Sequence, residues 1–143
     1  MGYLIRFFTT SPLMSMIPIQ AQMYQAGFEV QPAGTNALDI YYASDYPPLT
    51  ADLAASTKDD AKADIMAFIE AVSDYSNHPS QNMILNILSQ TQAIIAIGIP
   101  DDFPDSYQRS LNELLTLVSD MAEGLFHVEG EGFYDGAELI FEL

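Results

Sequence analysis

The pattern of apolar and polar positions is clearest in the last third of the chain, residues 91–143. Residues 92–99 form an apolar run that ends at Pro100, which predicts a central strand buried on both faces. Residues 107–125 then carry apolar side chains at the three- and four-residue spacing of a helix with one buried face. Two alternating segments follow, 125–129 and 138–143, with glycines between them. This third therefore predicts a strand, a helix and a closing hairpin.

The earlier part of the chain carries weaker periodic signals. Residues 3–9 are rich in aromatic and β-branched side chains and predict a first strand. A helix is expected after it, up to Ala26, with Gly27 as the residue that ends it. Residues 28–30 and 38–43 predict a short hairpin. Two helices are expected next, one that Thr57 caps and one over residues 81–89. The element order thus mixes strands and helices along the whole chain.

This order predicts an α+β fold with two layers, a mixed sheet and helices mainly on one face of it. The preferred topology is ferredoxin-like with an inserted helix pair, because two β-α-β units can be drawn from the order. No internal repeat or long linker divides the 143 residues, so we expect a single domain over residues 1–143. With no cysteine in the chain, neither a disulfide framework nor a thiolate metal site is expected.

The net charge of -16 comes from 20 acidic and 4 basic residues, and it is unevenly distributed. Residues 1–37 hold one acid and one base, whereas residues 77–143 hold eleven acids and a single arginine, for a net charge of -10. Such a surface repels phosphate backbones, so we expect no direct binding to nucleic acid or to an anionic membrane. It would attract a basic protein partner, although an acidic balance also serves solubility alone. We expect a cytoplasmic protein, because the start of the chain lacks a signal-peptide pattern.

Two acidic clusters are candidates for chemistry. Asp101, Asp102 and Asp105 lack the spacing of a calcium loop, and they predict instead the N-terminal cap of the following helix, with Asp105 and Gln108 as a capping box. The second cluster holds the weak metal candidates of the chain. His127 and Glu129 lie two residues apart on a predicted strand and share a face, and two more acids follow in the turn. The candidate metal ligands are His127, Glu129, Glu131 and Asp135.

Tyrosines beside carboxylates are a further candidate, for a protein-binding surface. A buried ring gives such a surface its contact area, and the charge steers a basic partner towards it. The alternative is that these rings are half buried in strands for stability alone. The candidate partner-binding residues are Tyr41, Tyr42, Tyr46, Glu131, Phe133, Tyr134 and Asp135.

Function does not follow from any known catalytic motif, because the chain has no nucleophile elbow, phosphate loop or dinucleotide fingerprint. The leading hypothesis is a non-enzymatic acidic module, without a cofactor, that binds another and plausibly basic protein as an inhibitor, immunity-like or regulatory domain. One alternative is a metal-binding protein or hydrolase centred on the His127 cluster. The other is a structural subunit of a homo-oligomer, with Met14, Met16 and Met23 as an adaptable apolar interface.

Overall fold

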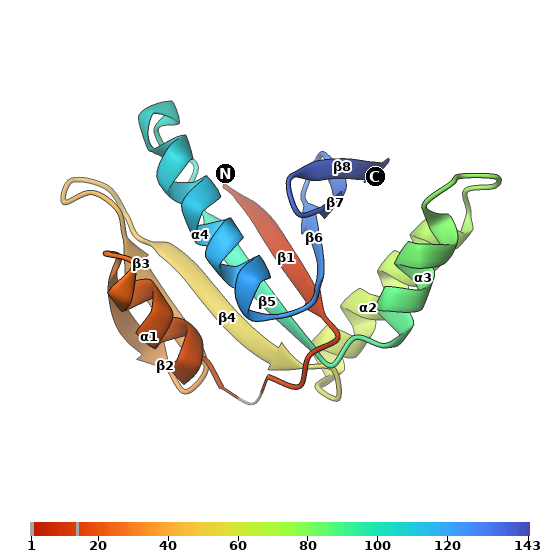
Figure 1. Cartoon of the computed structure of the whole chain (residues 1–143), viewed down its shortest axis with the longest axis horizontal. Coiled ribbons are helices and arrows are strands. Elements are labelled where there is room, and N and C mark those ends of the chain that lie inside the picture. The colour runs from red at the N-terminus through yellow and green to blue at the C-terminus, as the bar shows by residue number, and fades with distance from the viewer. Residues whose placement is uncertain (1, 14) are drawn as a thin grey trace.

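The computed structural model describes residues 2–13 and 15–143, over which the chain forms four α-helices and one eight-stranded sheet (Figure 1). The helices are α1 (Ile17–Gln25), α2 (Asp59–Ser73), α3 (Gln81–Ser89) and α4 (Gln108–Met121), with a short 3-10 helix η1 (Asp105–Tyr107) before α4. The strands are β1 (Tyr3–Thr9), β2 (Glu29–Gly34), β3 (Ala37–Tyr41), β4 (Leu49–Ala55), β5 (Ala93–Ile99), β6 (Gly124–Val128), β7 (Gly132–Asp135) and β8 (Glu138–Glu142).

The strands lie in the order β2-β3-β4-β5-β1-β6-β7-β8, with β5 and β1 near the middle. All seven pairings between the described strands are antiparallel, so the prediction of a mixed sheet is wrong, although the α+β class is confirmed. Consecutive strands that are joined by short loops, such as β2 with β3 and β6 with β7, pair as hairpins and are antiparallel for that reason. Two central strands depart from this local rule. β1 pairs with β5 and β6, which lie far along the chain, and β4 pairs with β5 across the intervening helices α2 and α3.

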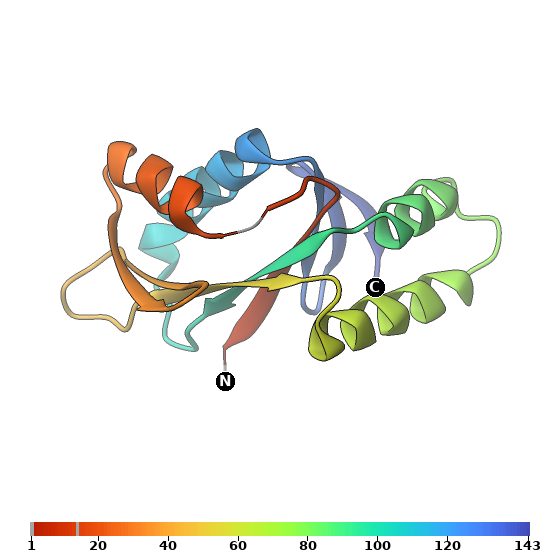
Figure 2. The same ribbon diagram turned by 90° about the horizontal axis from the view of Figure 1, so that it is seen from below.

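Helices cover both faces of the sheet, which corrects the expectation that they lie mainly on one face. Neighbouring residues of a strand point to opposite faces, and each central strand here is apolar on both. Phe7 and Ile95 belong to a core with α1 and α4, whereas Phe8 and Ile94 belong to a second core with α2 and α3. Figure 2 shows α1 and α4 above the sheet and α2 below it. The fold therefore has more than two layers.

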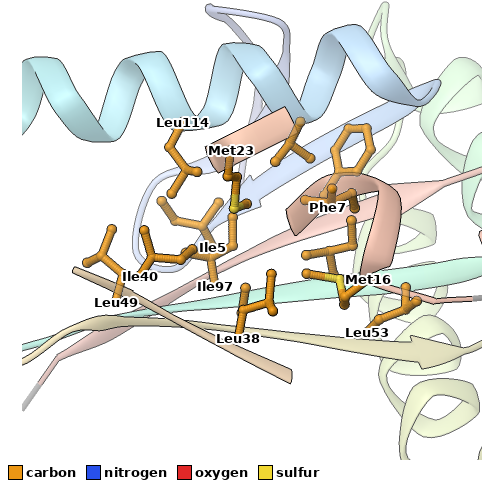
Figure 3. Packing of buried hydrophobic residues seen from close by; sticks show 14 of the residues in the cluster. Ile5, Phe7, Met16, Met23, Leu38, Ile40, Leu49, Leu53, Ile97 and Leu114 are labelled. Atoms are coloured by element: carbon orange, nitrogen blue, oxygen red, sulfur yellow. The ribbon is translucent and has the colours of Figure 1, made fainter. Parts of the chain in front are cut away.

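The larger core lies between the sheet and the helices α1 and α4. Figure 3 shows Leu114 of α4 and Met23 of α1 directed at side chains of the central strands, among them Ile5 and Ile97. Met16 and Met23 are 2% and 0% exposed, so these two methionines are core residues and do not form the exposed apolar interface that the oligomer hypothesis needs. Met14, the third residue of that hypothesis, lies outside the described residues.

Several predicted elements are found where the pattern placed them. The structure confirms the first strand over Tyr3–Thr9, the central strand over Ala93–Ile99 and the long helix that follows it. Two strands were missed, β4 entirely and β7 within what was expected to be a turn. Helix starts were also misjudged, because no side-chain hydrogen bond caps α2 or α4. Along the described chain, no helix combines the length and the apolar character needed to cross a bilayer.

Candidate functional site

Four aromatic side chains gather where the loop after β3 meets the turn after β5. Tyr42 is at their centre, and the centroid of its ring lies 4.9 Å from that of Phe103, 5.2 Å from Tyr107 and 6.1 Å from Tyr46. Tyr46 also contacts Tyr107 edge to face, at 6.2 Å. Edge-to-face and offset pairs of this kind stabilise each other beyond their buried area. Two segments about sixty residues apart in sequence are thereby held as one aromatic surface.

Acidic side chains surround this cluster. Asp45 lies in the tyrosine loop, Asp101 and Asp102 lie in the turn that carries Phe103, and Asp105 begins η1, which ends at Tyr107. All four carboxylates are exposed. We call the four rings and these four acids the acidic aromatic rim. Burial raises the pKa of the Tyr42 phenol, and the nearby charge of Asp102 raises it further. The aspartates were expected to form a capping box, but neither η1 nor α4 has a side-chain cap, so the capping prediction is wrong.

The side chains of the rim differ in how far they are buried. Tyr42 and Phe103 are partly buried against the larger core, whereas Tyr46 keeps 37% of its surface exposed. The phenolic oxygen of Tyr42 is itself buried, and it has no hydrogen-bond partner among the described residues. Such a surface presents rigid rings and unburied negative charge side by side. It suits guanidinium or ammonium groups, which stack on aromatic faces and pair with carboxylates.

The second set of predicted partner-binding residues lies at the other side of the sheet, around β7. Glu131 and Asp135 are exposed, and Tyr134 is half buried, with its hydroxyl donating a 2.5 Å hydrogen bond to Glu131 Oε1. Phe133 is 0% exposed and packs in the second core, so its assignment to a contact surface is wrong. In the sheet order, β4, β5, β1 and β6 separate β3 from β7. The two halves of the predicted surface are thus not brought together.

Tyr41, the remaining predicted tyrosine, ends β3 opposite Glu29 of the edge strand β2. Its neighbours in the strand show which face it takes. Ile40 is buried in the larger core, and successive strand residues alternate, so Tyr41 is directed to the opposite face from that core. Tyr42 packs against the larger core and therefore lies on the side of the sheet where the rim forms. Tyr41 lies on the other side, away from the rings of Tyr46, Phe103 and Tyr107.

His127, the centre of the metal hypothesis, is a core residue. It is 5% exposed, and its ring centroid lies 4.5 Å from that of Phe68 and 4.9 Å from that of Phe133. Glu129, Glu131 and Asp135 are exposed instead. Among the described residues, no three histidine or carboxylate side chains are grouped so that they could hold a metal ion. Sequence proximity suggested that the candidate ligands lie together, but His127 is buried under Phe68, whereas the three carboxylates lie after the end of β6 and are exposed.

The surroundings of His127 disfavour its charged form. Neither ring nitrogen has a hydrogen-bond partner in the described part of the chain. Burial lowers the pKa of His127, and the charge of Arg6, directly opposite on β1, lowers it further, while the backbone of Leu143 and the Glu129 carboxylate act in the opposite direction. Arg6 is held by Asp64, with Nε and Oδ2 3.2 Å apart, and lies over the Phe68 ring. His127 is therefore a packed ring whose charged form is disfavoured.

Sequence reasoning missed two members of the rim, Phe103 and Tyr107. The sequence pattern assigned Phe103 to a turn and Tyr107 to a helix face, and nothing in it connects either residue with Tyr42. The missing information was the position of β4, because that strand returns the chain from the tyrosine loop alongside β5. The turn after β5 then lies at the same end of the sheet as the loop before β4.

Comparisons with protein-family models, with curated proteins and with solved structures gave no match for this chain.

Proposed function

We propose that this chain is a non-enzymatic module that binds a basic protein through the acidic aromatic rim. The observation that carries the proposal is the packing of Tyr42, Tyr46, Phe103 and Tyr107 into one cluster beside exposed aspartates. Protein interfaces commonly rely on a few aromatic anchors with charged groups around them. The rim supplies both, on a chain whose net charge is -16.

Preorganisation supports this role. The rings contact one another before any partner arrives, so little side-chain entropy remains to be lost on binding. Arginine or lysine side chains of a partner could lie against Tyr46 and Tyr107 and pair with Asp102 or Asp105. The long-range field of the acidic chain would also accelerate the encounter, and this effect weakens as salt screens the charge.

An inhibitor or immunity-like role is the form of the proposal that fits the charge best. Basic proteins that act on nucleic acid present arginine and lysine clusters to phosphates. An acidic surface with rigid rings carries negative charge, as phosphate does, and would compete with nucleic acid for these arginine and lysine clusters. A small module can in this way occupy the nucleic-acid site of a basic enzyme and stop its activity.

The test is affinity capture at low salt from the source cell, followed by a salt series and identification of the protein that elutes. We expect a basic protein that is released between roughly 0.1 and 0.5 M salt, where the screening length becomes short. The rim variant Asp45→Asn/Asp102→Asn/Asp105→Asn should lose most of the captured protein, because it removes the charge that the partner pairs with.

The matched control removes the same charge elsewhere, as Glu70→Gln/Asp74→Asn/Asp120→Asn, at exposed positions on α2, directly after α2 and on α4. This control should retain the partner. Equal loss in both variants would mean that net charge alone attracts the protein, and the rim would then have no special role. If no protein is captured by the unaltered chain at low salt, the partner-binding proposal is wrong.

We also propose that the central part of the sheet is ferredoxin-like. The support is the order β4-β5-β1-β6, with α1 leaving β1 and α4 leaving β5, both packed in the same core. In this interpretation α2 and α3 are the inserted helix pair between β4 and β5. The hairpins β2–β3 and β7–β8 extend the sheet at its two edges.

A further inference from the structure

A groove runs along the side of α4 that faces away from α1. Figure 1 shows α4 crossing the sheet with α1 on one side and the strands β6, β7 and β8 on the other. The helices α1 and α4 share one core with the sheet, and within residues 2–13 and 15–143 the part of the sheet beyond α4 carries no further helix on this face. The space between α4 and the strands β1, β6 and β7 therefore remains open as a groove of about 560 Å³.

The walls of this groove are mainly aliphatic and aromatic. Its volume lies in the range of about 300 to 1,000 Å³ that is usual for small-molecule sites, which are likewise apolar with a few polar groups. The sheet and the inner side of α4 supply the apolar walls, which are Ile5, Leu111, Leu115, Phe126 and Val128.

Among the described residues that line the groove, one carries a charged side chain. Glu131 lines it together with Tyr134, which donates a 2.5 Å hydrogen bond to Glu131 Oε1. Tyr3 lines it too, and the pKa of its phenol is raised by burial and then by the charge of Glu131. In the described part of the chain, neither lysine nor arginine lines the groove, and the ion pairs found there, Arg6 with Asp64 and Arg109 with Glu113, do not involve Glu131.

From this arrangement we infer that the groove binds a small organic cation with an apolar body, such as a primary amine on an aliphatic chain. The apolar walls would take the body, and the ammonium group would meet Glu131 between two tyrosines. This site is separate from the acidic aromatic rim, so the inference does not depend on the proposed protein partner. The charge of Glu131 and the strongly acidic chain select a cation over a neutral or anionic ligand of the same shape.

The experiment compares three ligands of one chain length, octylamine, 1-octanol and octanoate, in titrations followed by backbone amide shifts. Octylamine should bind about tenfold more tightly than octanol, the ratio expected of one charge-assisted hydrogen bond, and octanoate should bind least. The largest shifts should fall on Val128, Tyr134 and the facing residues of α4. Glu131→Gln should abolish the preference for the amine, because it removes the charge and keeps the shape.

Two further variants make the result decisive. Glu129→Gln removes the same charge two residues away, at an exposed position that does not line the groove, and should leave the preference unchanged. Ala137→Trp, at an exposed lining position, should fill the groove and weaken all three ligands. Equal binding of octylamine and octanol, equal effects of the two glutamine variants, or shifts that do not saturate would each overturn the inference.

Discussion

Replacing His127 with phenylalanine should change how the stability of this protein depends on pH. The imidazole is buried between Phe68 and Phe133, and both of its nitrogens lack a hydrogen-bond partner among the described residues. Burial lowers the pKa of His127 from its ordinary value of 6.5. A phenyl ring keeps the aromatic contacts and removes the group that must stay uncharged.

The sign of the effect follows from proton linkage. Below pH 6.5 the unfolded chain binds a proton at this histidine, whereas the folded chain, with its lower pKa, does not until the pH falls further. The free energy of unfolding therefore falls with falling pH over that interval, by up to about 1.4 kcal/mol per pH unit. The His127→Phe variant has no imidazole to protonate, so its free energy of unfolding does not fall with pH for this reason. At neutral pH the variant should also gain part of the roughly 1 to 3 kcal/mol that an unpaired buried polar group costs, less any cost of fitting the larger ring.

Urea unfolding of both proteins between pH 7.5 and 5, followed by circular dichroism, measures the difference. The gap between variant and unaltered chain should widen as the pH falls through 6.5, and it should reach a plateau below the folded-state pKa. His78→Gln is the control, because it removes the other histidine of the chain and should leave the slope from His127 in place. A gap that stays constant over the whole range would show that burial does not keep this ring neutral.

Two further predictions concern backbone and hydrogen-bond packing near the start of β6. Gly124→Ala should destabilise the fold by about 3 kcal/mol or more in the same urea assay, because an added Cβ would lie 2.0 Å from the Phe8 carbonyl oxygen on the neighbouring strand. Thr9→Val should cost about 1 to 3 kcal/mol, since the fully buried Thr9 hydroxyl donates to the Glu123 carbonyl and accepts from the Ser11 amide. Thermal unfolding gives a second measurement. If either substitution lowers the midpoint temperature of unfolding by less than about 1 °C, the contact used for that prediction does not stabilise the fold as described.

The elements that could be predicted are those in which the pattern of apolar residues matches one simple pattern of burial along the whole element. β5 is apolar at every position because both faces are covered, and α4 shows one apolar stripe because one side faces the core. β4 carries a regular alternation as well, with Leu49, Ala51 and Leu53 buried. Its three alanines and the preceding prolines obscured the signal, since alanine is a weak strand former and proline indicates a loop.

The candidate site was harder to predict than the fold, because both faces of the sheet are occupied. A histidine and a glutamate two apart on a strand share a face, but only where a helix pair covers that face does the histidine become buried. Phe68 of α2 supplies this cover for His127, while Glu129 follows the last residue of β6 and is exposed. Long-range packing therefore decides which of two neighbouring polar residues is core and which is surface.

The central place of β1 has a consequence for how the chain folds during synthesis. Residues 3–9 are made before both of their partner strands, because β5 and β6 begin only at Ala93 and Gly124. Until then Phe7 and Phe8 have no strand to pair beside, and non-local pairings of this kind close slowly. Until both partner strands have been made, a nascent chain carries an apolar segment with no strand beside it, and such a chain is prone to aggregate. A product that stops short of residue 124 would keep one edge of β1 open, ready to pair with another chain.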